Sequence, residues 1–199
     1  TFLLHSWPSA AHTIYLDFDG HVTEGTTWNS EISSIVSPAF DPDGDGASFS
    51  DSELSSIQEI WKRVSEDFSP FEINVTTEDP GVAALAKGGN DDEEWGIRVV
   101  ITEDWIECGC GGVAYLESFN DTQDEPVFVF NQSEIGVSAA TSHEVGHALG
   151  LSHDGTSSST NAGSDDSAHS HDDHEHVICS VPLENANSNT EYYGGHGTG

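Results

Sequence analysis

One stretch of this sequence spaces its histidines in a fixed pattern: HEVGHALGLSHD, residues 143–154. His143 and His147 are one helical turn apart, so a helix would present both imidazoles on one face. Gly150 lets the chain adopt a left-handed conformation and leave that helix sharply. This exit would bring His153 back toward the other two histidines. The spacing therefore predicts three nitrogen ligands around one zinc ion.

The same stretch predicts chemistry as well as metal binding. Three protein ligands leave a fourth position for water, the pattern of a catalytic zinc site, and zinc lowers the pKa of that water toward about 7. Glu144 is the expected general base, which takes the proton and passes it to the leaving amine. Every fixed position of H-E-x-x-H-x-x-G-x-x-H is filled. The alternatives are a helix with ordinary polar histidines and a zinc site without activity.

The residues before this motif predict strands and helices in alternation. Expected strands are 12–18, 71–77, 96–102, 112–118 and 126–131, from their β-branched, aromatic and apolar residues. A capping box at Ser50 and Glu53 starts a helix that Pro70 ends. A second helix is expected over 138–149, closed by Gly150. This order predicts an α/β or α+β fold, a sheet flanked by two long helices.

The chain divides into two expected parts. Residues 1–154 would form a subdomain that carries the zinc motif, and 155–199 would begin a partial C-terminal subdomain. Residues 155–176 are Gly, Ser, Thr, Asn, Asp and His without apolar periodicity, which predicts a long mobile loop. Its histidines favour either weak capture of a transition metal or a solvated loop: His169, His171, His174 and His176.

The charge is strongly acidic, with 36 Asp and Glu against 4 Lys and Arg and a formal net charge of -32. It argues against nucleic acid and against anionic lipid as partners. A solvated acidic shell and the attraction of basic substrates both explain it. The sequence has no apolar run of about 18 residues and no intact signal peptide at its start. Secretion is therefore expected only with the signal and pro-segments already removed.

The three cysteines are Cys108, Cys110 and Cys179. An odd number in a secreted protein predicts a free thiol or a partner outside the chain. Cys108 and Cys110 lie too close together in an extended segment to pair comfortably. We therefore expect one of them to form a disulfide with Cys179.

An acidic stretch at Asp41, Asp43 and Asp45 resembles the start of a calcium loop, with oxygens at positions 1, 3 and 5 and Gly46 at position 6. A true EF-hand is not expected, because Ser52 stands where the twelfth position needs Glu. A looser calcium site and a simple acidic turn both remain open.

Residues 143–154 resemble the metzincin clan of zinc metallopeptidases, and Asp154 after the third histidine is similar to its reprolysin (adamalysin-like) branch in a bacterial version. The resemblance covers about residues 10–154, and its specific part is the motif. It implies a mixed sheet of about five strands, two long helices and an active-site cleft. It also implies that the strand at 112–118 is the edge strand along which a protein or peptide substrate binds extended. The expected activity is a secreted endopeptidase.

One feature departs from that family. Metzincins carry a methionine-containing turn after the third histidine, and this chain has no methionine. We expect the chain to be truncated or cut before that turn. Two alternatives to an active protease follow: an inactive fragment that needs a C-terminal piece, and a non-catalytic zinc- and calcium-binding module. The chain's own pro-segment or C-terminal fragment would then be a partner.

Overall fold

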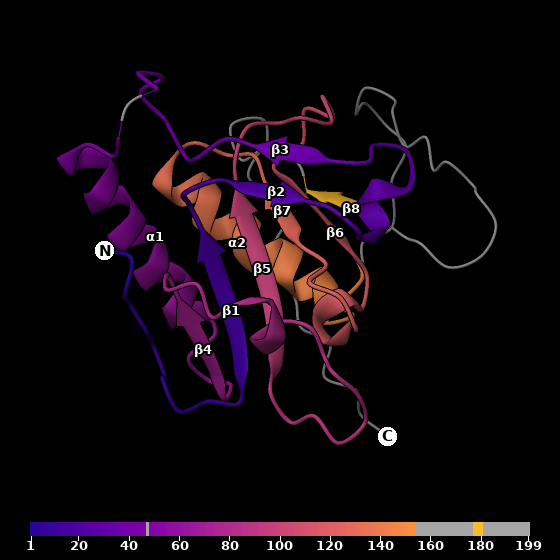
Figure 1. The fold of residues 1–199 in the computed structure, drawn as a ribbon. Helices are drawn as coiled ribbons and strands as arrows, with labels where there is room; N and C mark the ends of the chain where they lie inside the picture. Colours follow the sequence, from indigo (N-terminus) through magenta and orange to yellow (C-terminus); the bar gives the residue numbers. More distant parts are fainter. Residues whose placement is uncertain (47, 154–176, 181–199) are drawn as a thin grey trace.

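A mixed sheet forms the centre of the computed structural model, which describes residues 1–46, 48–153 and 177–180 (Figure 1). Its strand order is β4-β1-β5-β7-β6-β8. The strands are β1 (His12–Asp17), β4 (Ile73–Thr76), β5 (Trp95–Ile101), β6 (Gly112–Tyr115), β7 (Val127–Val129) and β8 (Val177–Ser180). Strands β4, β1, β5 and β7 are parallel, whereas β6 runs antiparallel to both β7 and β8.

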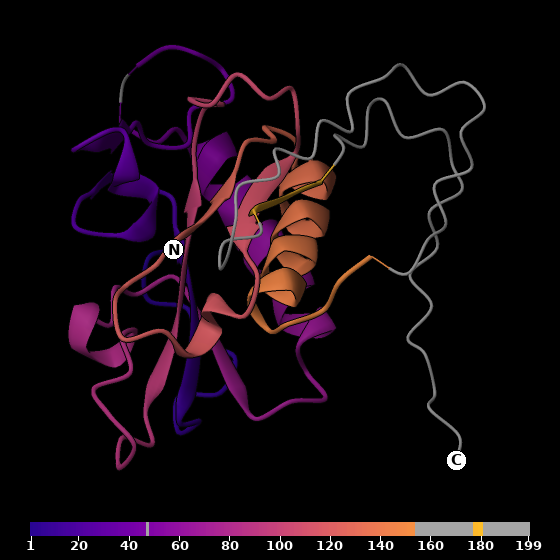
Figure 2. The ribbon, with the colours of Figure 1, turned by 90° about the vertical axis from the view of Figure 1, so that its right-hand side faces the viewer.

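Two long helices, α1 (Asp51–Asp67) and α2 (Glu134–Ala148), lie on the same face of the sheet (Figures 1 and 2). The predicted capping box starts α1, because Ser50 accepts from the Glu53 N–H and the Glu53 carboxylate accepts from the Ser50 N–H. Ile57 and Ile60 of α1 are fully buried. The main core lies between the helices and the sheet. The predicted mixed α/β architecture with two helices is confirmed.

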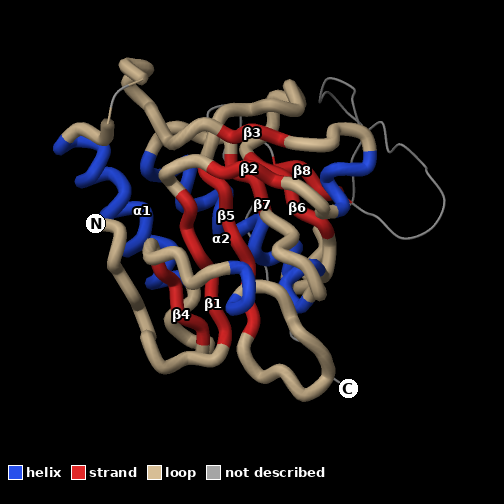
Figure 3. Tube along the Cα trace, viewed as in Figure 1, coloured by secondary structure: helices blue, strands red, loops and turns tan. Residues whose placement is uncertain are grey.

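A second, smaller core lies on the opposite face of the sheet. There the 3-10 helix η1 (Thr27–Ser30) and a hairpin of β2 (His21–Thr23) and β3 (Ile35–Ser37) cover β5, β6 and β7 (Figure 3). Trp28 anchors this layer: its ring packs on Phe128, and its Nε1–H donates to the Pro126 carbonyl at 2.8 Å. The hairpin is a feature that the sequence does not predict, because its strands are three residues long and lie in a polar stretch. Two further 3-10 helices are η2 (Val82–Ala84) and η3 (Ser118–Asn120).

Two predicted boundaries are wrong. Helix α2 begins at Glu134, four residues before the predicted start at 138, because Ser133 caps it by accepting from the Gly136 N–H. Its first turn, Glu134 to Val137, contains a glycine and has no long apolar stripe, so helical periodicity does not reveal it. Strand β6 ends at Tyr115 and not at 118, because Glu117 takes a left-handed conformation (φ 64°) that leads into η3.

At the two edges of the described sheet, short segments pair with β4 and with β6. On the β4 side, the Ser6 N–H donates to the Val75 carbonyl and the Thr77 N–H donates to the Leu4 carbonyl. On the β6 side, β8 pairs along the whole of β6. The expectation that the 112–118 strand forms the edge of the sheet is therefore wrong. The outermost strand on this side is β8, which follows the histidine motif in the sequence.

Several expectations fall outside the described residues. They concern the loop and histidines of 155–176, Asp154, most of the proposed 155–199 subdomain, and the side chain of Cys179. Within the described part of the chain, none of the helices combines the length and apolar character that a membrane span requires.

A buried charge cluster lies on the hairpin side of the sheet, around Arg98 of β5. Arg98 Nη1 donates to Asp17 Oδ2 at 2.7 Å, and its Nε donates to Asp124 Oδ2 at 2.9 Å. The side chains of Arg98 and Asp17 are only 5% and 2% exposed. The guanidinium thus pairs with the buried carboxylate of Asp17 and the largely buried carboxylate of Asp124, which ties β5 to the end of β1 and to the segment before β7.

We expect Arg98→Met to destabilise the fold by about 3–5 kcal/mol, because it leaves Asp17 and Asp124 buried without their cation. Chemical denaturation measures this directly. The control is Arg63→Met, which removes a cation whose side chain is 43% exposed and paired with Glu59 on α1. It should change stability by no more than about 0.5 kcal/mol. Equal effects of the two substitutions would contradict a structural role for the cluster.

Candidate metal centre

The three predicted histidines meet at the C-terminal end of α2. His143 and His147 project from the same face of the helix, with their Nε2 atoms 2.9 Å apart. His153, which follows the helix, has its Nε2 3.2 Å from that of His147 and 3.0 Å from that of His143. The structure therefore brings together all three residues predicted as ligands.

A sharp turn at Gly150 returns the chain to the helix. Gly150 has a φ of +92°, a conformation that favours glycine. Its N–H donates to the His147 carbonyl at 2.8 Å, and the next N–H, of Leu151, donates to the Gly146 carbonyl at 2.9 Å. These two bonds are those of a Schellman motif, the usual glycine-dependent helix end. The predicted role of Gly150 is confirmed, and this turn is what aims His153 at the other two rings.

The three nitrogens are arranged as a metal requires. Tetrahedral zinc with Zn–N distances of about 2.0–2.1 Å separates its ligand nitrogens by about 3.3–3.4 Å. The Nε2 separations of 2.9, 3.0 and 3.2 Å approach that triangle. Three imidazole donors are a donor set of catalytic zinc sites, in which water takes the fourth position. The residues present thus fit zinc.

Leu151 orients the His147 ring. His147 Nδ1 lies 2.6 Å from the Leu151 carbonyl oxygen. A carbonyl only accepts, so the ring proton is on Nδ1 and the lone pair of Nε2 points to the centre of the triangle. Sequence reasoning missed this contact, because any residue at 151 offers a carbonyl.

Burial favours the neutral form of two of the histidines, His143 and His147. Burial, with help from the neighbouring His147 and His153, lowers the pKa of His143 to about 4. Burial also lowers the pKa of His147. Neutral imidazole is the form that binds metal, so at neutral pH no proton has to leave these two rings first.

Glu144 is fully buried beside β6. A Cβ added to Gly112, the first residue of β6, would lie 2.8 Å from Cγ of Glu144 and 2.7 Å from the Phe128 carbonyl oxygen. Only glycine lets α2 approach the sheet this closely. Gly112 therefore sets the position of the predicted base. The sequence shows that glycines precede this strand, but it does not indicate that Gly112 contacts Glu144.

The acidic stretch before α1 also gathers its carboxylates. Oxygens of Asp41, Asp43 and Asp45 lie within 4.8 Å of one another. Asp41 accepts backbone N–H bonds from Gly44 and Gly46, both at 2.9 Å, and these bonds lower the pKa of Asp41. The loop is thus folded around Asp41, an arrangement that serves a calcium loop and an acidic turn equally well.

The predicted disulfide to Cys179 is wrong. Cys108 and Cys110 are bonded to each other, with their Cα atoms 5.2 Å apart. The prediction assumed an extended segment, but Glu107 and Gly109 have positive φ values of 58° and 64°. These left-handed residues curl the chain so that the two sulfur atoms meet. The Asp104 carboxylate supports the curl by accepting from the Gly109 N–H at 2.9 Å.

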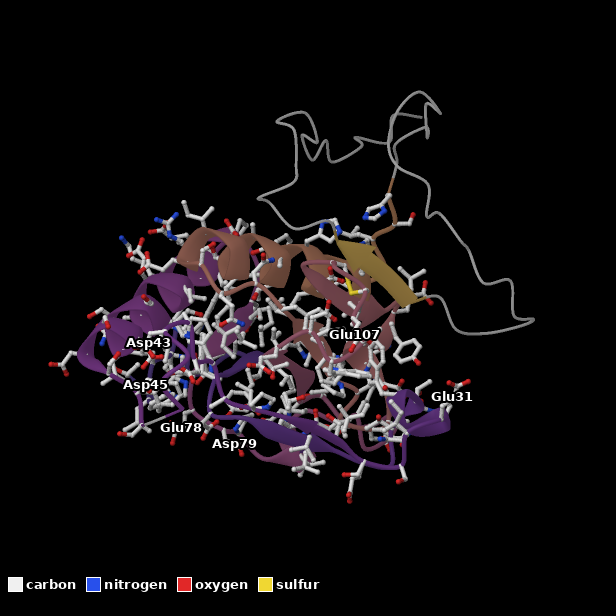
Figure 4. All side chains as sticks on the ribbon, turned by 90° about the horizontal axis from the view of Figure 1, so that it is seen from above. Glu31, Asp43, Asp45, Glu78, Asp79 and Glu107 are labelled. Atoms are coloured by element: carbon white, nitrogen blue, oxygen red, sulfur yellow. A yellow bond between two sulfur atoms is a disulfide. The ribbon has the colours of Figure 1, made fainter. Side chains whose placement is uncertain are left out.

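Acidic side chains are spread over the molecule. Figure 4 labels Asp43 and Asp45 near the start of α1, and Glu31 and Glu107 toward the other end. This spread agrees with an acidic shell, although it leaves the attraction of basic substrates open. No protein-family model, curated protein or solved structure matches the chain.

We expect Gly112→Ala to destabilise the protein by about 1–3 kcal/mol, because the new methyl group overlaps Glu144 and the Phe128 carbonyl. Urea unfolding is the measurement. Gly88→Ala is the matched control, since its Cβ would meet only the Asp92 carboxylate, at 3.2 Å. That change should stay within about 0.5 kcal/mol. An unaltered midpoint for Gly112→Ala would contradict the close approach of α2 to β6.

Thermal unfolding separates the two interpretations of the aspartate triplet, a calcium loop and an acidic turn. If the triplet is a calcium loop, calcium at ten times its Kd should stabilise the fold by about 1.4 kcal/mol and raise the unfolding midpoint by about 3–5 °C. Asp43→Asn should remove most of this shift, whereas Glu31→Gln, an equal change of charge at an exposed site, should retain it. Thermal unfolding with and without calcium tests both. An absent shift in the wild-type chain favours the acidic turn.

Proposed function

We propose that this protein is a zinc-dependent endopeptidase. The observation that carries the proposal is the triangle of Nε2 atoms from His143, His147 and His153, with Glu144 on the same helix. The motif alone predicts these roles, and the convergence of the three rings supports them. A relationship to the metzincins, and to their reprolysin branch, is part of the same proposal.

The chemistry would divide between the metal and the chain. Zinc, when bound, lowers the pKa of water and polarises the peptide carbonyl. Glu144 takes a proton from the attacking water and returns it to the amine as the peptide bond breaks. Gly112 holds this carboxylate close to the sheet, and the Leu151 carbonyl fixes the ring of His147. Both contacts position reacting groups without entering the reaction.

The substrate would be a protein or peptide in extended form. Strand β6 runs past Glu144, but β8 already pairs along it, so an extended peptide adds to this part of the sheet only when β8 has left. Secretion is supported by the Cys108–Cys110 disulfide, since such bonds persist in oxidising compartments. The negative charge of the chain makes nucleic acid and anionic membranes unsuitable partners.

A non-catalytic metal-binding module is the second candidate. It is favoured by the presence of two separate groups with metal-ligand chemistry, the histidine triangle and the aspartate triplet. A third reading is an inactive fragment, whose activity would return on adding downstream sequence. Metal content and hydrolysis, measured on the same samples, separate the three.

We expect about one zinc per chain for the wild type and for Glu144→Ala, because Glu144 is not a ligand. Chelator-sensitive hydrolysis of casein should occur with the wild type and fall by about 10²–10⁴-fold in Glu144→Ala. His153→Ala should lose zinc, whereas His5→Ala, a histidine paired with Glu78 away from the site, should keep it.

Zinc in wild type and Glu144→Ala with no hydrolysis by either would contradict the enzyme and favour the binding module. Recovery of hydrolysis on adding downstream sequence would identify the chain as a fragment. Absence of zinc from the wild type would contradict all of these roles for the histidines.

A further inference from the structure

Strand β8 occupies the side of β6 on which a substrate strand would bind. Its residues pair antiparallel with β6 in the register Val177 to Tyr115 and Ser180 to Gly112. Strand β6 is therefore hydrogen-bonded on both sides, to β7 and to β8. A peptide that added to β6 by main-chain hydrogen bonds would need the donors and acceptors that β8 already uses.

The register places β8 beside the proposed base. Gly112 is the β6 residue that contacts Glu144, and Ser180 lies directly across from Gly112. Opposed residues of an antiparallel pair have Cα atoms about 4.5–5.5 Å apart. Strand β8 also lies against α2, the helix that carries His143 and His147 (Figure 2). The backbone near Ser180 thus passes the same point that a substrate must reach.

We propose that Val177–Ser180 is an internal pseudosubstrate strand, which excludes extended peptides from β6 until it leaves. The regulatory part of this proposal rests on the proposed peptidase function; the occupation of β6 does not. Glu144, 0% exposed in this arrangement, agrees with a closed state. Strand β8 is four residues long and, among the described residues, has one neighbouring strand, so a peptide that displaces it has only this short ladder with β6 to replace.

Attachment makes β8 an effective competitor. Because β8 belongs to the same chain as β6, its pairing is intramolecular, and it competes with a peptide from solution at an effective concentration that does not depend on the amount of protein. The apparent affinity of a peptide from solution is reduced by the fraction of molecules whose β6 edge is free. Weakening β8 should therefore increase peptide binding without altering any residue of α2 or β6.

The first test uses the unaltered chain. Alternate residues of a strand direct their N–H groups to opposite neighbours, so two of the amides of 112–115 face β7 and two face β8. Gly111 accepts from the Phe130 N–H, so alternation places the N–H groups of Gly112 and Ala114 on the β8 side. We expect hydrogen exchange to find these two amides protected. If both exchange freely, β8 does not pair with β6 and the proposal is overturned.

The second test is peptide binding in zinc-loaded Glu144→Ala, where the peptide is not cut. The probe is a fluorescein-labelled peptide of residues 175–182 with serine in place of Cys179. It is titrated against chains with the native β8, with Ile178→Pro and with Cys179→Pro. Only one of these neighbouring residues directs its N–H to β6, so one proline removes a ladder hydrogen bond and the other is its matched control.

We expect one proline variant to bind the probe at least about tenfold more tightly than the native chain, and the other to behave like the native chain. Replacing 177–180 by Gly-Ser-Gly-Ser should reproduce the gain. Equal affinities in all four proteins would overturn the proposal.

Casein hydrolysis by the same β8 variants, now with Glu144 retained, separates this inference from the proposed function. The tighter-binding variant should also raise the initial rate. If probe binding increases but no variant hydrolyses casein, the peptidase function is contradicted, and the proposal that β8 blocks peptide binding to β6 is retained. If the wild type hydrolyses casein and no change in β8 alters the rate, the pseudosubstrate role of β8 is contradicted and the peptidase function is retained.

Discussion

The left-handed turn at Gly150 is the constraint on which the metal centre depends. A helix can present His143 and His147 one turn apart, but it cannot place a third ring opposite them. The Schellman turn ends α2 directly after His147 and reverses the chain, so that His153 returns to within 3.2 Å of both rings. The same reversal brings the Leu151 carbonyl to His147 Nδ1. One backbone conformation therefore supplies a third donor and fixes the proton position of another.

The packing of α2 imposes the second constraint. Most residues of this helix are buried, and several of them are small. Glu144 and His147 are 0% exposed. At Gly112 the absence of a side chain lets Glu144 lie directly against β6. The buried carboxylate and the glycine are thus two halves of one contact. A larger residue at 112 would displace the Glu144 side chain from this position.

The sequence predicts the parts whose signals are local. The strands at 12–18 and 96–102, the capping box at Ser50 and the histidine spacing of α2 are each readable from neighbouring residues. The start of α2 and the β2–β3 hairpin are not, because small residues show no periodicity and three-residue strands give too short a pattern. The Cys108–Cys110 bond was mispredicted because its loop depends on left-handed backbone at Glu107 and Gly109. Gly112 and the Leu151 carbonyl depend on tertiary contacts, which no local pattern contains.

The arrangement of sheet edges connects the fold to its proposed regulation. An unpaired strand edge invites pairing with another chain. In the described residues, short segments pair with the outer edges of β4 and β6, and β8 is itself the outermost strand. On the β4 side, the cover is the N-terminal segment, which precedes β1 in the chain and whose contacts involve no residue of the metal centre. On the β6 side, the cover is β8, a segment beyond the metal motif that also lies against α2. Helix α2 packs on the face of the sheet beside β6, so a strand that pairs with β6 also lies against α2. In the proposed regulation, protection of the β6 edge and access to Glu144 are therefore one equilibrium: when β8 leaves, the edge is exposed and a peptide can pair with it, and when β8 returns, the edge is covered and the peptide is excluded.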